Sequence, residues 1–286
     1  MTGAPLFSRG GVTIVGVLNV TPDSFSDGGR FVRAGGAVDR DAAVAAGLAL
    51  VAAGADVLDV GGESTRPGAR EVGADEEIAR AIPVLEALAK ASRIPLAIDT
   101  RKAGVAEAAL AAGASIVNDV SGLRFDPALA AVVARAGARL VLGHLRGEPA
   151  TMQDDPRFED VLAEVAQELA ASAERAQAAG VARERLVVDP GIGFGKRLED
   201  NLVLLANVGE LRRRVGLPVL VGASRKSFLG RLTGEPPGRR DAASHAAAAV
   251  AVFAGADAVR VHDVAGARAA VAVGFALRGA RREAGA

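Results

Sequence analysis

Short apolar runs recur eight times along this chain of 286 residues, separated by stretches long enough to form helices. The runs are rich in valine, isoleucine and leucine, and most of them show little alternation of apolar and polar residues. Runs of this kind are typical of strands that are buried on both faces, as in a parallel sheet. We therefore expect eight parallel strands, at residues 13–18, 56–60, 95–98, 115–117, 139–142, 186–188, 218–221 and 258–261.

The stretches between the runs carry the apolar spacing of amphipathic helices. In the stretch 158–179, apolar residues recur at helical spacing and are followed by Gly180, a residue well suited to end a helix. The stretch 75–91 carries a similar stripe, but Pro83 lies inside it. Because proline removes a helical hydrogen bond, we expect a kink or a later helix start there.

A weak internal repeat joins these units. The segment A-A-G-A-D-V-L-D-V at 52–60 resembles A-A-G-A-S-I-V-N-D at 111–119, and the segments 136–142 and 254–261 follow the same plan. Each reads as a helix end, a glycine in a left-handed cap, a tight turn and a buried strand. Eight such strands alternating with about eight helices predict an α/β protein with a (β/α)8 TIM barrel, and an open doubly wound sheet is the alternative. No low-complexity linker divides the chain, so we expect a single domain over 1–286 with its core at about 12–275.

Composition excludes several classes of function. Lys and Arg number 34, as do Asp and Glu, and a net charge of zero argues against nucleic acid as the main partner. The chain has no cysteine, which rules out disulfides and thiolate chemistry and fits a reducing compartment. It has neither an apolar run long enough to span a membrane nor a secretory signal at its N-terminus, so we expect no membrane association and a cytoplasmic location.

A polar residue stands at or near the end of every expected strand. In a barrel of this kind the active site lies at the C-terminal ends of the strands, and buried polar groups are costly unless they are paired. Any one of these residues could be a simple cap or turn residue, but the whole set points to a functional site. The set comprises Asn19, Asp59, Asp99, Asn118, His144, Asp189, Ser224 and Arg260 with His262.

Arg260 and His262 are two positions apart on one expected strand, so their side chains share one side of the sheet. A guanidinium and an imidazole together suit an anion such as phosphate. The alternative is a structural ion pair with the neighbouring Asp257 or Asp263.

Two carboxylates and an amide, those of Asp99, Asp189 and Asn118, can together bind a flat heterocycle rich in N–H donors. A carboxylate accepts two parallel N–H bonds from an amidine-like edge. Lys226, in the run S-R-K-S after the seventh strand, could add a donor, although a solvated basic turn is the alternative.

The glycine-rich segment D-P-G-I-G-F-G-K at 189–196 matches neither of the common nucleotide-binding patterns. A Walker A loop would need glycine at 190 and Ser or Thr at 197, and the dinucleotide fingerprint has different glycine spacing. We interpret it as a flexible loop that lets Phe194 and the backbone approach a ligand. The polar loops at 19–29 and 61–68 are longer than usual strand-to-helix connections, which is typical of functional lids.

Taken in order, these motifs resemble bacterial dihydropteroate synthase over almost the whole chain. The motifs are N-V-T-P-D-S-F-S-D-G-G, G-G-E-S-T-R-P-G, I-D-T at 98–100, N-D-V-S-G at 118–122, D-P-G-I-G-F-G-K, S-R-K-S and R-V-H-D at 260–263. The resemblance implies a homodimeric (β/α)8 barrel, a transferase of folate synthesis. Such an enzyme joins 6-hydroxymethyl-7,8-dihydropterin diphosphate to 4-aminobenzoate with Mg2+, releases diphosphate, and has sulfonamides as competitors.

The resemblance also implies roles for individual residues. Those expected at the pterin are Asp99, Asn118, Asp189, Lys226, Leu145 and Phe194. Those expected at the diphosphate are Asn19, Thr65, Arg260 and His262, with Asn19 also binding Mg2+. Those expected at 4-aminobenzoate are Thr65, Arg66, Ser227, Phe25 and Phe194. The residues expected to act directly in the reaction are Arg260, His262, Lys226 and Asp189.

One motif departs from the family pattern. Many members carry Met-His-Met after the fifth strand, whereas this chain has Gly143-His144-Leu145. We expect Leu145 to supply an apolar face to the pterin, with altered packing and unchanged chemistry. Two alternative functions stay open at this point: a methyltetrahydrofolate:corrinoid methyltransferase, which would have no diphosphate to hold, and a catalytically silent pterin-binding paralogue.

Overall fold

The computed structural model describes residues 11–21, 38–65, 71–149 and 151–284, without the side chains of 282–284. Its sheet has eight parallel strands, and each of the eight predicted runs forms one of them. The strands are β1 (Thr13–Asn19), β2 (Val57–Gly61), β3 (Leu96–Asp99), β4 (Ile116–Asp119), β5 (Arg139–Gly143), β6 (Leu186–Asp189), β7 (Leu220–Val221) and β8 (Ala258–Val261).

The sheet closes into a barrel. Neighbouring strands pair in the order β6-β5-β4-β3-β2-β1-β8-β7, and a parallel bridge between Val188 and Val219 joins β6 to β7. β7 is shorter than predicted, since Pro218 has no N–H to donate; its carbonyl still accepts from Val188 N at 2.9 Å. The closed ring confirms the (β/α)8 barrel and rules out the open doubly wound sheet.

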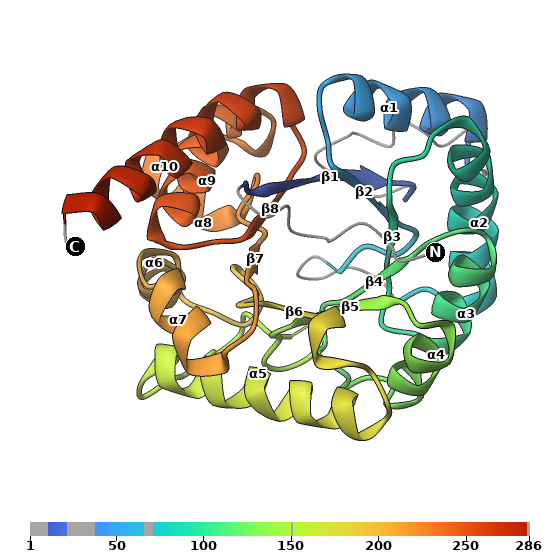
Figure 1. Cartoon of the computed structure of the whole chain (residues 1–286), viewed down its shortest axis with the longest axis horizontal. Helices are drawn as coiled ribbons and strands as arrows, with labels where there is room; N and C mark the ends of the chain where they lie inside the picture. The colour runs from blue at the N-terminus through green and yellow to red at the C-terminus, as the bar shows by residue number, and fades with distance from the viewer. Residues whose placement is uncertain (1–10, 22–37, 66–70, 150, 285–286) are drawn as a thin grey trace.

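Helices surround the barrel on its outer side (Figure 1). They are α1 (Arg40–Ala52), α2 (Ala74–Ala91), α3 (Ala103–Ala111), α4 (Ala128–Ala136), α5 (Val161–Ala178), α6 (Leu198–Ala206), α7 (Val208–Val215), α8 (Ser227–Thr233), α9 (Asp241–Ala254) and α10 (Val264–Ala284), with short 3-10 helices at Arg183–Arg185 and Pro237–Arg239. α2 runs through the exposed Pro83, so the expected later start is wrong. Burial of Ala81, Val84 and Leu88 against the barrel outweighs the local cost of the proline.

Two apolar layers hold the barrel together. The larger lies between the outer faces of the strands and the helices. The smaller is a ring inside the barrel, to which each strand contributes one buried side chain. Its members are Val15, Val57, Ala97, Ile116, Val141, Val187, Leu220 and Ala258. The ring fills the interior, so ligands can enter only above it, at the strand ends.

The repeated Ala-Gly-Ala turn behaves as predicted. Gly137 ends α4 in the left-handed region with φ of 60°, and Gly54 after α1 has φ of 98°. The equivalent Gly113 and Gly255 also have positive φ, which glycine adopts at little cost. These turns return the chain to the start of the next strand.

Within the described residues, none of the helices has the length and apolar character needed to cross a membrane.

Candidate active site

A layer of polar side chains lies directly above the apolar ring. Because side chains alternate along a strand, the residue two positions after each ring residue faces the same interior. Five of these eight positions hold polar residues, on five different strands. The five are Asp59, Asp99, Asn118, Asp189 and Arg260. Four of them are predicted from the sequence to bind a ligand, whereas Asp59 is predicted only as a polar residue at a strand end.

Arg260 is the centre of this layer. Its Nε donates to Asp59 Oδ2 at 2.5 Å, and its Nη2 donates to Asp99 Oδ2 at 2.6 Å. Asn118 Nδ2 donates to the same Asp59 oxygen at 3.0 Å. Asp59, Asp99 and Asn118 are buried, so these charge-assisted bonds join strands from different parts of the ring into one network.

The alternative pairing of Arg260 with Asp257 or Asp263 is wrong. Asp257 accepts from Arg212 Nε at 2.8 Å, on the outside of the barrel, and Asp263 pairs with His245 at 3.0 Å. Arg260 lies within β8 and faces the barrel interior. Asp257 precedes this strand and Asp263 follows it, and each of them pairs with a residue other than Arg260.

Two buried carboxylate oxygens in the layer have no hydrogen-bond partner in the described part of the chain. They are Asp59 Oδ1 and Asp99 Oδ1. Burial raises the pKa of Asp99 to about 7; the charge of Arg260 opposes the rise, and the Asp59 carboxylate adds to it. Since leaving a buried acceptor unsatisfied is costly, the layer is suited to a ligand that brings N–H donors or a cation.

Asp189 and Lys226 lie on the neighbouring part of the mouth. Gly191 N donates to Asp189 Oδ1 at 2.7 Å. Burial raises the pKa of Asp189, while the Gly191 bond and the charges of Lys226 and Arg260 lower it. Lys226 Nζ lies 3.6 Å from the centroid of the Phe194 ring, a cation–π contact that joins the loop after β6 to the loop after β7.

Arg225, beside Lys226, anchors the loop after β7. It has φ of 57°, unusual for a residue with a side chain, and its Nε and Nη2 bind Asp241 on α9 at 2.7 and 2.9 Å. Its backbone N donates to Ser244 Oγ at 2.9 Å. The alternative of a solvated basic turn is therefore wrong for Arg225, which holds the segment that presents Lys226.

Asn19 lies close to Asp99. These two residues flank Gly61 in the register of β1, β2 and β3. A Cβ placed on Gly61 would lie 3.3 Å from Asn19 Oδ1 and 3.6 Å from the Asp99 Cβ. The glycine thus leaves room for both side chains, and the Asn19 amide oxygen stands at the edge of the polar layer.

The remaining predicted residues lie further out. His262 Nδ1 and Ser224 Oγ are 3.0 Å apart, so the ends of β8 and β7 are tied together. Thr65 is half-buried in the segment after β2, and Ser227 is exposed as the first residue of α8. Phe25 and Arg66 lie outside the described residues.

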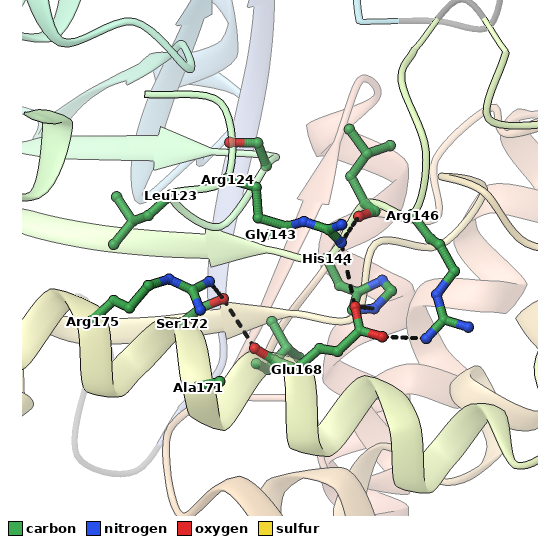
Figure 2. A pocket seen from close by; sticks show the side chains of 12 residues that line it. Leu123, Arg124, Gly143, His144, Arg146, Glu168, Ala171, Ser172 and Arg175 are labelled. Atoms are coloured by element: carbon green, nitrogen blue, oxygen red, sulfur yellow. Dashed lines mark hydrogen bonds and ion pairs between the residues drawn. The ribbon is translucent and has the colours of Figure 1, made fainter. Parts of the chain in front are cut away.

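His144 faces away from this layer. Its ring lies toward α5 and lines a cavity of about 520 Å³ (Figure 2), together with Glu168, Arg146, Arg124 and Arg175. The alternation of β5 predicts this direction, since Gly143 faces the interior. The expectation that the polar residue at every strand end converges on one site is therefore wrong for His144. Leu145 is buried and also lines this cavity.

A second buried network holds the segment after β2. Lys102 Nζ donates to Glu63 Oε2 at 2.8 Å and to Glu77 Oε2 at 2.7 Å, and Glu63 Oε1 accepts from Val72 N at 2.9 Å. Burial raises the pKa of Glu77, opposed by Lys102. The network fixes both ends of the loop that contains Thr65.

Sequence reasoning missed the roles of Asp59, Lys102, Glu168 and Arg225. Asp59 carried a usable signal, because it stands two positions after an interior valine of the same strand. Glu168 stands within α5, where its sequence neighbours say nothing of His144.

No group of three or more His, Asp or Glu side chains is arranged to hold a metal ion in the parts of the chain that the structure describes. Asn19 offers a single amide oxygen, across Gly61 from Asp99 at the edge of the polar layer. Such a donor set fits Mg2+ only as an ion held mainly by substrate oxygens and water, which is a common arrangement for Mg2+ on phosphates.

Comparison with known proteins gives the site a context. A family model described as "Pterin binding enzyme" matches residues 15–262. The chain is 50% identical over 260 residues to the dihydropteroate synthase of Mycobacterium leprae, covering 88% of this chain and 89% of the relative. Among solved structures, it resembles Yersinia pestis dihydropteroate synthase in a sulfonamide drug complex, with a TM-score of 0.88 and 41% identity over 94% of each chain. It also resembles Xanthomonas albilineans dihydropteroate synthase with 4-aminobenzoic acid, with a TM-score of 0.84, 46% identity, and coverage of 94% and 93%.

Proposed function

The chain belongs to the dihydropteroate synthases of the pterin-binding enzyme family, and from this premise we propose how its own residues divide the work. Dihydropteroate synthase is a transferase that joins 6-hydroxymethyl-7,8-dihydropterin diphosphate to 4-aminobenzoate, giving 7,8-dihydropteroate and diphosphate. Relatives that match most of the chain are dihydropteroate synthases, which leaves the corrinoid methyltransferase alternative without support.

The observation that carries the proposal is the pair of orphaned buried oxygens in the polar layer. We assign the edge of the pterin to Asp99, Asn118 and Asp189, with Lys226 as an added donor. The ring system of a pterin brings N–H donors, which would satisfy the carboxylate oxygens, and Asn118 can both donate and accept. Phe194 and Leu145 would contribute apolar surface to the flat ring.

The diphosphate would lie outward of the pterin, next to the strand ends of β1, β2 and β8. We assign it to Arg260, His262, Thr65 and Asn19. Arg260 uses two of its N–H donors on Asp59 and Asp99, so an approaching phosphate would compete with these carboxylates or accept from its other donors. Asn19 would hold Mg2+ together with diphosphate oxygens, and the bound ion would neutralise charge on the leaving group.

The reaction needs orientation and electrostatic stabilisation more than a strong base. The bond between the pterin methylene carbon and the diphosphate oxygen breaks, a bond from the amine nitrogen of 4-aminobenzoate to that carbon forms, and the amine loses a proton. Arg260 and His262 stabilise the departing negative charge. Asp189 in its ionised form, which the charges of Lys226 and Arg260 favour, would support positive charge that develops on the pterin ring.

We place 4-aminobenzoate at the outer part of the mouth, against Thr65, Arg66, Ser227, Phe25 and Phe194. The Lys226–Phe194 contact supports this placement, because it sets an aromatic face beside the proposed pterin donors. The relative from Yersinia pestis was solved with a sulfonamide drug, and we propose that sulfonamides compete at the same position here.

We further propose that the protein is a homodimer. Large apolar side chains are exposed on α9 and α10, which pack against each other: Val250 and Phe253 on the first, Val273 and Leu277 on the second. Burial of such side chains between two copies would be favourable. Light scattering coupled to size-exclusion chromatography would return the mass of two chains, whereas the mass of one chain would reject this assignment.

Turnover of the pterin diphosphate with 4-aminobenzoate and Mg2+ tests the activity directly. We expect dihydropteroate and diphosphate in equal amounts. Pterin binding without turnover would instead identify a silent paralogue.

A further inference from the structure

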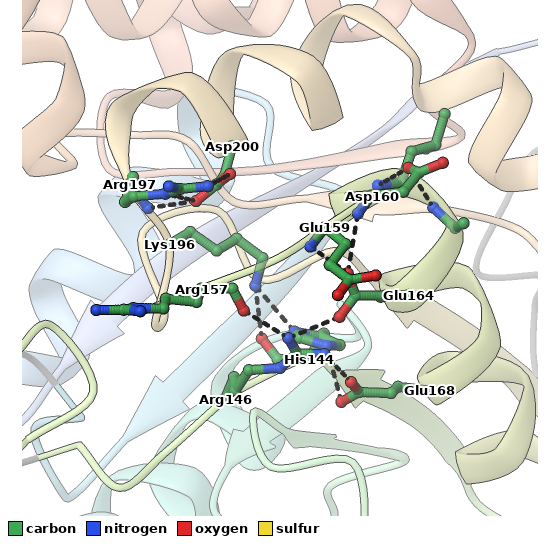
Figure 3. Close-up of polar contacts among 12 residues, drawn as sticks. His144, Arg146, Arg157, Glu159, Asp160, Glu164, Glu168, Lys196, Arg197 and Asp200 are labelled. Carbon is green, nitrogen blue, oxygen red and sulfur yellow. Dashed lines mark hydrogen bonds and ion pairs between the residues drawn. The ribbon is translucent and has the colours of Figure 1, made fainter. Parts of the chain in front are cut away.

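The reaction outlined above gives no role to Lys196, although this lysine is among the most buried charged residues of the molecule, with 3% of its surface exposed. Its Nζ lies 2.9 Å from His144 Nδ1, 3.0 Å from the Phe194 carbonyl oxygen and 3.4 Å from the His144 carbonyl oxygen. Figure 3 shows the ammonium reaching the His144 ring. A buried ammonium is costly unless its donors are used, and all three N–H groups have acceptors here.

These contacts define the state of His144. Burial, together with the charge of Lys196, lowers the pKa of His144 to about 4, although the bond to Glu168 opposes the shift. The imidazole is thus neutral near neutral pH. Because Nδ1 accepts from Lys196, the ring proton lies on Nε2 and points to Glu168 Oε2 at 3.1 Å. Arg146 holds the other oxygen of Glu168.

The chain of bonds ends at the loop after β6. Gly191 and Gly195 have positive φ, and a Cβ on either would collide with the backbone carbonyl of His144 or Arg146. The loop is therefore pressed against the segment after β5. Gly191 and Gly195 thus allow the loop after β6 to pack closely on the segment after β5, in addition to any space that the glycines of this loop leave for a ligand.

We propose that Lys196 is a positioning residue for the reaction: its buried ammonium ties the Phe194 carbonyl to the end of β5 and thereby sets the place of the Phe194 ring at the barrel mouth. The inference rests on the proposed placement of Phe194 beside the pterin and 4-aminobenzoate. The residue needs no contact with either substrate. Its effect passes through the loop backbone and the Lys226–Phe194 contact.

The charge of Lys196 also bears on Asp189. Burial lowers the pKa of Lys196 to about 7, while Asp189 and Glu168 raise it and Arg146 and Lys226 lower it. Below that pH the ammonium favours the ionised form of Asp189; above it this help is lost. The charged or titratable groups that face Lys196 from the surrounding elements are Asp189, His144, Arg146, Glu168, Lys226 and Asp200.

The sequence offers a direct probe of the loop, because the chain has no tryptophan or tyrosine. Phe194→Trp introduces a single emitter at the position in question. In this background we compare Lys196→Met with Arg197→Gln, which removes the neighbouring half-exposed cation that binds Asp200. We expect Lys196→Met to lower the fluorescence anisotropy and to increase quenching by acrylamide. Arg197→Gln should leave both unchanged, and equal values in the two variants would overturn the proposal.

Kinetics of the chain with Phe194 retained give the second readout. Because small displacements of a positioned group cost large factors in rate, we expect Lys196→Met to lower kcat/KM for 4-aminobenzoate at least about tenfold. In the unaltered protein we expect kcat/KM to fall above about pH 7 as Lys196 loses its charge, and this fall should be absent from the variant. Turnover by the unaltered protein tests the proposed function; its absence would refute that function, while the fluorescence test of Lys196 would still decide the inference.

If Lys196→Met fails to fold, substitutions of His144 keep the proposal testable. Asparagine places an amide oxygen near the position of Nδ1 and keeps an acceptor for Lys196, whereas glutamine reaches toward the position of Nε2 and Glu168. His144→Asn should retain the anisotropy of the Phe194→Trp reporter, and His144→Gln should lower it. The reverse order would contradict a role for the Lys196 contact.

Discussion

Arg260 Nη2 on β8 donates to Asp99 Oδ2 at the end of β3 at 2.6 Å, although 161 positions separate the two residues in the chain. The bond crosses the barrel mouth and places the only guanidinium of the polar layer between the proposed pterin and diphosphate positions. Asp99 keeps one oxygen without a partner in the described chain, and the guanidinium of Arg260 has further N–H donors beyond the two that bind Asp59 and Asp99. Asp99 can thus accept a hydrogen bond from a ligand, while Arg260 can bind an anion.

Removal of the cation from this layer should destabilise the fold. Arg260→Met leaves Asp59 and Asp99 buried without their counter-ion, and breaking a buried pair in this way costs about 3–5 kcal/mol. We expect a loss of that order in the free energy of unfolding, measured by denaturant titration at pH 8.

A second substitution checks the cause. In the Arg260→Met background, Asp59→Asn removes one of the uncompensated charges and should recover part of the lost stability. If the double variant is as unstable as the single variant, uncompensated charge is not the reason for the loss. Because Arg260 also holds Asp99, the single variant should bind even the bare pterin more weakly.

Asp189 should dominate affinity for the pterin. Asp189→Asn keeps an acceptor for Gly191 N, so the loop should hold, but it removes the negative charge that accepts from the pterin edge. We expect pterin binding to weaken at least about tenfold, equivalent to about 1.4 kcal/mol, in isothermal calorimetry. The exposed Asp155→Asn is the matched control and should bind as the unaltered protein does. Unchanged affinity in a folded Asp189→Asn would remove this residue from the site.

Binding of 4-aminobenzoate should depend on the other substrate. Thr65 and Asn19 are the residues that we assign to the diphosphate and Mg2+, so these ligands should complete the surface that 4-aminobenzoate contacts. We expect weak 4-aminobenzoate binding to the free protein and much tighter binding once pterin, diphosphate and Mg2+ are supplied. Parallel titrations measure this difference; the same dissociation constant in both would refute the coupling.

His144 should make the fold sensitive to mild acid. Its folded pKa of about 4 lies below the ordinary value of 6.5, so between these values the unfolded chain binds more protons. Stability should therefore fall as the pH drops from about 6.5 to about 4, by at most about 1.4 kcal/mol per pH unit. Unfolding titrations across this range measure the slope.

His144→Gln supplies the comparison, because glutamine does not titrate. The variant should be less stable near pH 7, where it lacks the bond to Lys196, but its stability should change less between pH 6.5 and 4. An identical slope would show that other groups cause the acid sensitivity.

The architecture of the barrel is predictable from the pattern of apolar residues alone. Each of the eight strands is predicted to within two residues at either end. A strand that is buried on both faces must be apolar along its whole length, so consecutive residues of the sequence are enough to identify it. The Ala-Gly-Ala turns were predictable for the same reason, since only a residue without a side chain enters the left-handed region at low cost. Pro83 is the exception among the elements: its local cost was visible, but the burial that outweighs it was not.

The partners of each side chain within the site, in contrast, depend on the folded barrel. Composition and spacing identify Arg260, Asp99 and Asn118 as polar strand ends, but the structural partners that the sequence suggests as an alternative for Arg260 are its neighbours and not Asp59, 201 positions away. The direction of His144 and its bonds to Lys196 and Glu168 were likewise invisible. The alternation of side chains along a strand determines whether a side chain faces the interior, and this can be predicted from the local sequence. Which charged group it meets in the interior depends on how the eight strands close into one barrel, and that is known only from the folded structure.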